Sequence, residues 1–215
     1  MAQYLDIILI SLILTDLMLL GASRMWHLTQ MVALQGALLA LVPLFSTAPG
    51  NIPMHLALLC LAVFSIKALA FPVLLARTAR RVGVTSMVEP YLGFSLSVAC
   101  GIAGLLFSFW LESRLSLPGL PFTSLLLPAS ITTIIAGLLL IIGRRKALTQ
   151  VIGYLVMENG IFLFGSPAAE QGSVWMELSI LLDVFVAVFV MGIAILNINR
   201  TFESIDVDRF CSLRD

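Results

Sequence analysis

Long apolar runs separated by short polar breaks dominate this sequence. A helix needs about 20 apolar residues to cross a bilayer core of roughly 30 Å, and in lipid its backbone polar groups must be paired within the helix itself. Seven runs approach or reach that length, and they cover Tyr4–Gly21, Trp26–Phe45, Met54–Leu75, Tyr91–Leu111, Ser124–Ile142, Ala147–Phe164 and Val174–Asn197. We therefore predict an all-α integral membrane protein with about seven transmembrane helices.

The breaks between the runs differ in charge. Two of them, at 46–53 and 116–121, cluster Pro and Gly, which interrupt helices, and they carry little positive charge. Most basic residues lie in the other breaks and in the tail: Arg24, Arg77, Arg80, Arg81, Arg144, Arg145, Lys146, Arg200, Arg209 and Arg214. The positive-inside rule then places the N-terminus outside and the C-terminus in the cytoplasm.

Composition excludes several classes of protein. With 60% hydrophobic and 11% charged residues, the chain is unlike a soluble globular domain. Its 12 basic residues balance its 12 acidic residues, which gives no overall positive charge for nucleic acid. Three cysteines and two histidines show no metal-ligand spacing, and no phosphate-binding loop or catalytic triad is present, so we expect no metal and no active site in this chain. The N-terminus lacks the basic region of a secretory signal, and the first run is expected to stay in the membrane.

Four ionisable residues lie inside the predicted spans: Asp16, Lys67, Glu158 and Asp183. Each costs roughly 2.5 to 3.5 kcal/mol to insert, so such residues are retained where they pair or line a wet path. One interpretation is structural, with Asp16 and Lys67 at similar depth forming an ion pair and both Glu158 and Asp183 packed as protonated carboxyls. The other is a proton relay, in which burial and nearby charge bring the protonation states close in energy.

A second group of residues is predicted to shape the helices or their contacts. Pro72, five residues after Lys67, is expected to kink the third span and free carbonyl groups near the lysine. Gly153 and Gly160 allow close approach of another helix, which makes the sixth span a candidate for partner contact. Asn159 is a candidate for hydrogen bonds between helices.

Four stretches resemble hydrogenase-4 component E, a membrane subunit of formate hydrogenlyase-type complexes that carry a group 4 nickel-iron hydrogenase. The stretches are Arg144–Gly160 (RRKALTQVIGYLVMENG), Ser65–Leu75 (SIKALAFPVLL), Leu182–Met191 (LDVFVAVFVM) and Ser204–Asp208 (SIDVD). Together they extend over most of the chain.

The last three spans are also similar to the three-helix K subunit of respiratory complex I. That family carries a glutamate for lateral proton transfer in its middle helix. A gapless match from Gly153 places it at Leu155, and Glu158 lies about one helical turn further on the same face. The family's second glutamate aligns with Val188, so Asp183 is a candidate for its role without matching its position.

The resemblance implies a non-catalytic subunit of a complex I-like or hydrogenase-4-like energy-converting complex in a bacterial or archaeal cytoplasmic membrane. Its implied partners are antiporter-like subunits, a quinone-site-like anchor subunit, and peripheral hydrogenase-like subunits with iron-sulfur clusters and, in a hydrogenase, a nickel-iron (NiFe) centre. We divide the chain into residues 1–143 with five helices, residues 144–200 with two helices similar to subunit K, and a cytoplasmic tail at 201–215. Two alternatives remain: a subunit of a cation/proton antiporter without redox partners, and a scaffold that moves no protons.

Overall fold

The structure is a computed structural model that describes residues 2–46, 54–81, 91–115 and 125–166. In this part every element is a helix: α1 (Ala2–Gly21), α2 (Met25–Ser46), α3 (Met54–Val63), the π-helix η1 (Phe64–Ala70), α4 (Phe71–Arg81), α5 (Phe94–Arg114), α6 (Leu126–Gly143) and α7 (Ala147–Gly165). Six helices are long and apolar enough to cross a membrane, which confirms six of the predicted spans and a multi-pass membrane protein. The seventh predicted span, and Asp183 within it, lie outside the described residues.

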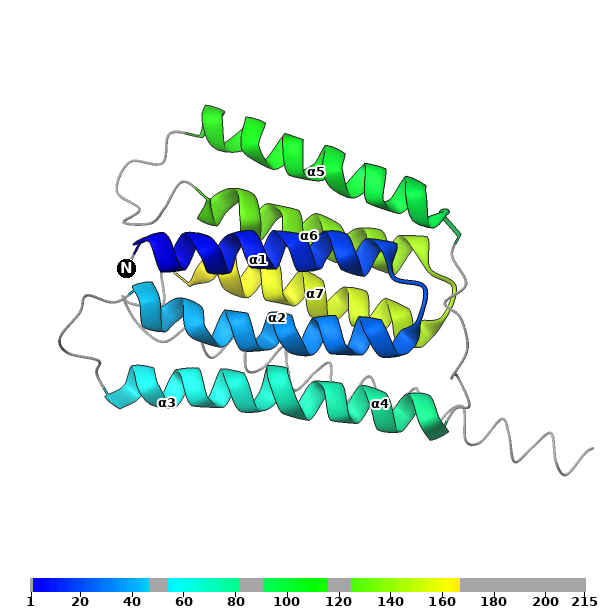
Figure 1. Cartoon of the computed structure of the whole chain (residues 1–215), viewed down its shortest axis with the longest axis horizontal. Helices are drawn as coiled ribbons and strands as arrows, with labels where there is room; N and C mark the ends of the chain where they lie inside the picture. The colour runs from blue at the N-terminus through cyan, green and yellow to red at the C-terminus, as the bar shows by residue number, and fades with distance from the viewer. Residues whose placement is uncertain (1, 47–53, 82–90, 116–124, 167–215) are drawn as a thin grey trace, which may run out of the picture.

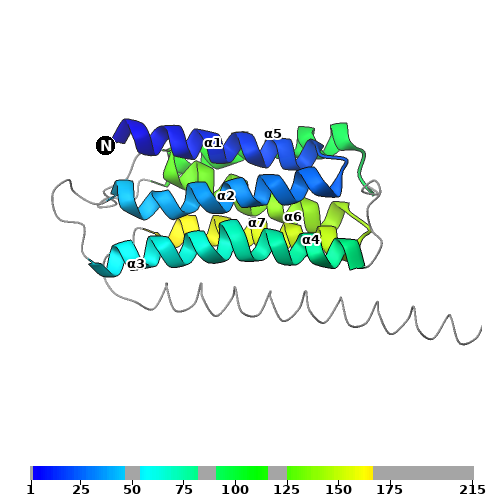
Figure 2. The same ribbon diagram turned by 60° about the horizontal axis from the view of Figure 1, so that its bottom comes forward.

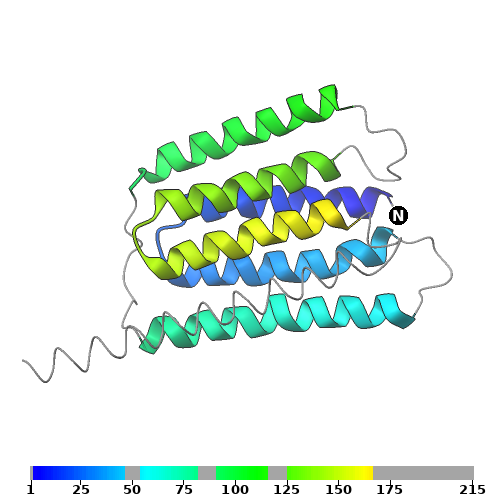
Figure 3. The same cartoon turned by 180° about the vertical axis from the view of Figure 1, so that it is seen from behind.

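The helices run side by side as one bundle (Figure 1). The α1, α2, α6 and α7 helices form its middle, while α5 covers one flank and the rod made by α3, η1 and α4 covers the other (Figures 2 and 3). Apolar side chains of the central helices, such as Leu28, Leu140 and Ile152, are fully buried. The outer faces remain apolar, as expected for helices that face lipid.

The third predicted span begins where the structure has it, since α3 starts at Met54, but it was expected to end too early. The prediction ended it at Leu75, whereas the helix continues through η1 and α4 to Arg81. The difference arises because α4 is amphipathic: Leu75 and Thr78 are buried, while Arg77 and Arg80 are exposed on the other face. Long arginine side chains extend their charge toward the interface and so remain compatible with a membrane-spanning helix.

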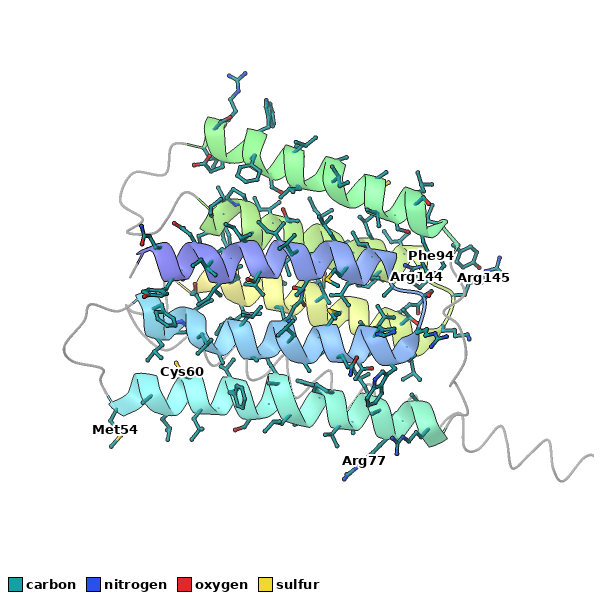
Figure 4. The ribbon with its side chains drawn as sticks, viewed as in Figure 1. Met54, Cys60, Arg77, Phe94, Arg144 and Arg145 are labelled. Atoms are coloured by element: carbon teal, nitrogen blue, oxygen red, sulfur yellow. The ribbon has the colours of Figure 1, made fainter. Side chains whose placement is uncertain are left out.

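The two ends of the bundle differ in charge. Arg77, Arg144 and Arg145 lie at one end, and Met54 lies at the other (Figure 4). The first end gathers the C-termini of α1, α4 and α6 with the N-termini of α2, α5 and α7 (Figure 1). The predicted topology, with this basic end in the cytoplasm, stays a prediction.

Candidate functional site

A buried ion pair joins the outer rod to the centre of the bundle. The Lys67 ammonium group on η1 donates to Oε1 of Glu158 on α7, and the side chains are 4% and 1% exposed. The ammonium also lies 5.8 Å from the centre of the Phe162 ring, within the range of a cation–π contact. The predicted ion pair between Asp16 and Lys67 is therefore wrong, because the lysine reaches the carboxylate of α7.

The backbone around Lys67 departs from an ordinary α-helix. In η1 the hydrogen bonds span five residues at the end of the segment, where the Phe71 N–H donates to the Ile66 carbonyl. Pro72 follows directly, and in α-helical winding its ring would clash with the carbonyl of Ala68. A π turn widens the helix at this point, and such turns often occur at functional sites.

Gly36 of α2 lets the rod approach closely. A Cβ atom at this position would lie 2.7 Å from the carbonyl carbon, 2.8 Å from the carbonyl oxygen and 2.9 Å from Cβ of Lys67. Real Cβ atoms essentially never come this near to backbone. The glycine thus positions the lysine against α2, from which its side chain reaches α7.

Asp16 lies in a second polar cluster among α1, α2 and α6. Its side chain is fully buried. Oδ1 accepts a hydrogen bond from Nε2 of Gln35 at 2.7 Å, and Oδ2 accepts one from Oγ1 of Thr133 at 2.7 Å. Two donors on one carboxylate compensate for part of its desolvation.

The two clusters are connected through side-chain amides. Nδ2 of Asn159 donates to Oε1 of Gln35 over 3.5 Å, which is long for a hydrogen bond. Asn159 directly follows Glu158, so α7 carries one residue of each cluster at successive positions. All five side chains are at most 4% exposed, so this polar chain lies in the bundle interior.

Glycines hold α6 and α7 in close contact. A Cβ at Gly137 would lie 2.6 Å from the Gly153 carbonyl oxygen, and a Cβ at Gly160 would lie 2.8 Å from the Ser130 carbonyl oxygen. Gly153 and Gly160 therefore pack within this chain, on the helix that carries Glu158. The close contact therefore sets the spacing between α6, which carries Thr133, and α7, which carries Glu158.

Arg144 is buried, although sequence analysis grouped it with the charged loop residues. Its side chain is 1% exposed, Nη2 donates to the Leu20 carbonyl at 2.7 Å, and the guanidinium lies 4.6 Å from the centre of the Phe94 ring. The Leu20 carbonyl belongs to the last turn of α1, where carbonyl groups lack partners in the helix and a cation is favourable. Burial lowers the pKa of Arg144 below its ordinary value.

Several residues of the site were missed by sequence reasoning. Thr133, Gly36 and Gly137 occupy positions that carry no charge, and glycine or threonine inside a span is common. Gln35 on α2 also belongs to the site, because it is buried against Asp16 whereas Gln30 on the same helix is exposed. The spacing of polar residues along α2 is the signal that could have found it, since Gln35 lies at the middle of the span.

The arrangement offers groups for binding protons and no evident site for a metal ion. Within residues 2–46, 54–81, 91–115 and 125–166, no three His, Cys, Asp or Glu side chains come together as metal ligands. Carboxyl, ammonium, hydroxyl and amide groups in a dry interior can accept, donate or orient protons.

Comparison with known proteins identifies relatives in the two groups that the sequence resembles, subunits of complex I and hydrogenase-4 component E. Residues 125–215 match the family of NADH-ubiquinone/plastoquinone oxidoreductase chain 4L. Hydrogenase-4 component E of Escherichia coli strain K12 is 26% identical over 153 residues, which are 71% of each chain. The predicted resemblance is confirmed.

A protein of Mycobacterium tuberculosis, Rv0085, is similar over a longer stretch. It is 27% identical over 209 residues, or 95% of this chain and 93% of its own length. Hydrogenase-4 component E of Shigella flexneri matches as the Escherichia coli protein does. No solved structure matches the chain significantly.

Proposed function

We propose that this chain is a non-catalytic membrane subunit of an energy-converting complex of the complex I or hydrogenase-4 kind, and that its buried ionisable residues take part in proton translocation. The observation that carries the proposal is the buried Lys67–Glu158 pair, which lies in the same bundle interior as Asp16 and its amide partner Gln35. The similarity to chain 4L and to hydrogenase-4 component E supports the kind of assembly.

The chemistry of the pair suits a proton-transfer step. Moving one proton from the Lys67 ammonium to the Glu158 carboxylate leaves an amine and a carboxylic acid, both neutral. In a medium of low dielectric the cost of burying two charges offsets much of their attraction, so the charged and neutral forms are closer in energy than in water. The pair can then take up or release a proton when a neighbouring charge changes.

Asp16 and Asp183 are proposed to extend the path. Gln35 and Asn159 connect Asp16 to the pair, and since amides do not readily release protons, they orient the carboxyls while water carries the proton between them. Asp183, in the seventh predicted span, is the proposed exchange partner of Glu158.

The proposed partners follow from the same resemblance. They are antiporter-like membrane subunits, a quinone-site-like anchor, and peripheral hydrogenase-like subunits that hold iron-sulfur clusters and, in a hydrogenase, a nickel-iron centre. We propose a cytoplasmic membrane location, with the basic end of the bundle facing the peripheral subunits.

Replacing Glu158 with Gln in the full complex tests proton transfer. In inverted membrane vesicles driven by the complex's own electron donor, we expect proton uptake per electron to fall by at least half while electron transfer continues. Glu112→Gln on α5 is the matched control, because Glu112 lies in the last turn of that helix and away from the polar chain. A scaffold would pump normally with Glu158→Gln, provided that the amount of assembled complex is unchanged.

Affinity purification of the tagged chain in mild detergent tests the kind of complex. We expect antiporter-like chains together with iron-sulfur subunits in mass spectrometry, and iron in metal analysis; nickel would name a hydrogenase. Antiporter-like chains without iron would replace the proposal by a cation/proton antiporter, and a lone chain would refute the complex.

A further inference from the structure

Thr133 has two acceptors for one hydroxyl hydrogen. Its Oγ1 lies 2.7 Å from Oδ2 of Asp16 and 2.9 Å from the carbonyl oxygen of Ala129, one turn earlier on α6. A threonine hydroxyl donates a single hydrogen and accepts through two lone pairs, and it rotates to suit its partners. Only one of the two contacts can be donated by Thr133 at a time.

This geometry satisfies Asp16 in both of its protonation states. When the carboxyl is ionised, Thr133 donates to Oδ2 and Gln35 donates to Oδ1. When Oδ2 carries a proton, that O–H donates to Oγ1 of Thr133, and the threonine hydrogen turns to the Ala129 carbonyl. Gln35 donates to Oδ1 in both states, and no heavy atom has to move.

We propose that Asp16 is a reversible protonation site inside the bundle and that Thr133 is its positioning residue, whose hydrogen bond reverses direction as the proton binds and leaves. The proton exchanges with water, and no other co-reactant is needed. The inference deepens the proposed function, on which its role in translocation rests, by naming the residue that allows Asp16 to change state in place.

The elements around Asp16 leave its immediate neighbours neutral. Gln35 of α2 and Thr133 of α6 are the residues that contact its carboxyl, and α6 contains no titratable side chain. The titratable residues on the other elements packed against α1 are His27 in the first turn of α2, and Cys100, Glu112 and Arg114 on α5; α1 itself adds Tyr4 and Asp6. On η1 and α7, which pack against α2, Lys67 and Glu158 are charged and pair with each other.

Infrared difference spectra of the full complex, recorded between high and low pH, test the proposal. We expect a reversible carbonyl band of a protonated carboxyl that disappears in Asp16→Asn, without a matching change in the backbone amide bands. In Thr133→Val this band should move to higher wavenumber, because the acid O–H loses its acceptor. Thr133→Ser keeps the hydroxyl and should leave the band in place.

Thr132→Val is the matched control on the same helix. Thr132 is also buried, but its hydroxyl contacts Ser108 of α5 and not Asp16, so the Asp16 band should stay unchanged. Folding of each variant is checked by its elution as assembled complex. The absence of a titrating band that depends on Asp16 would overturn the protonation site, and an identical band in Thr133→Val would overturn the role of Thr133.

The experiments distinguish failure of the proposed function from failure of this inference. If Glu158→Gln pumps normally while the Asp16 band titrates as expected, proton translocation by the chain is refuted and the protonation site stands. If the Asp16 band does not titrate while Glu158→Gln abolishes pumping, only the inference about Asp16 and Thr133 is lost.

Discussion

The Lys67 ammonium contacts the Glu158 carboxylate, although the two residues are 91 positions apart in the sequence. The rod that carries Lys67 packs along α2, and the lysine reaches past it to α7 beside Gly36. Each charge is buried and compensated by the other. The pair therefore tethers two parts of the bundle, and in the proposed function it also binds the proton that is transferred.

Removing one member of this pair should strongly destabilise the fold. Lys67→Met leaves the Glu158 carboxylate buried without its ammonium partner, which typically costs about 3 to 5 kcal/mol. Replacing both residues with Met should recover most of this loss, since a buried ion pair contributes little beyond an apolar pair of similar volume. The free energy of unfolding in mixed detergent micelles measures both effects.

Arg77→Met provides the control for Lys67→Met. Arg77 is exposed on α4, so Arg77→Met should lower the free energy of unfolding by less than about 1 kcal/mol. Equal losses for Lys67→Met and Arg77→Met would contradict the compensated pair, as would a double variant with the summed loss of the two single variants.

Gly36→Ala should disturb the site although it adds one methyl group. The new Cβ would meet the backbone of Lys67 at 2.7 to 2.8 Å, so η1 must shift away from α2. Overpacking of this kind costs about 1 to 3 kcal/mol, despite the higher helix propensity of Ala. Chemical denaturation of the purified chain should show the loss, and proton uptake should fall because the lysine moves.

The matched change is Gly93→Ala, which meets no atom within 4 Å. It should leave both stability and proton uptake close to those of the unchanged protein. A Gly36→Ala variant with normal stability would mean that the rod can accommodate an extra methyl group on α2.

The sequence predicted the spans well because span length and apolar character follow from the thickness of the bilayer. It also predicted which charges are buried, since Asp16, Lys67 and Glu158 interrupt apolar runs. It did not predict their pairing. Depth along a helix can be counted from the sequence, but the rotation of Lys67 toward α7 depends on the π turn and on the glycine of a neighbouring helix.

Arg144 illustrates a second limit of sequence reasoning. Its place in a basic run indicated a solvated loop, and its neighbour Arg145 is indeed exposed. Arg144 is buried and Arg145 is exposed because the C-terminus of α1 lies beside Arg144. There the Leu20 carbonyl accepts a hydrogen bond from Arg144, although the two residues are 124 positions apart in the sequence. A contact of this kind leaves no local pattern.

Arg144→Lys should weaken the basic end of the bundle. A lysine retains a charge but loses the planar stacking on Phe94, and its different donor geometry weakens the hydrogen bond to the Leu20 carbonyl. We expect a loss of about 1 to 3 kcal/mol, measured by unfolding in detergent. Arg145 is exposed, so Arg145→Lys should change the free energy of unfolding by no more than about 0.5 kcal/mol. A similar loss in both variants would argue against a specific role of Arg144.

Pro72→Ala should loosen the coupling between Lys67 and Glu158. Without the proline ring, η1 can wind as an ordinary α-helix, which turns a side chain by about 100° for each residue of register lost. Lys67 then points away from α7, and its coupling free energy with Glu158, measured by a double-mutant cycle in the Pro72→Ala background, should fall by more than half. Pro43→Ala removes a proline from the interior of α2 and leaves Pro72 in place, so it should preserve the coupling. Unchanged coupling in Pro72→Ala would show that the π turn is held by packing against α2 and Gly36, and that Pro72 has no part in positioning the lysine.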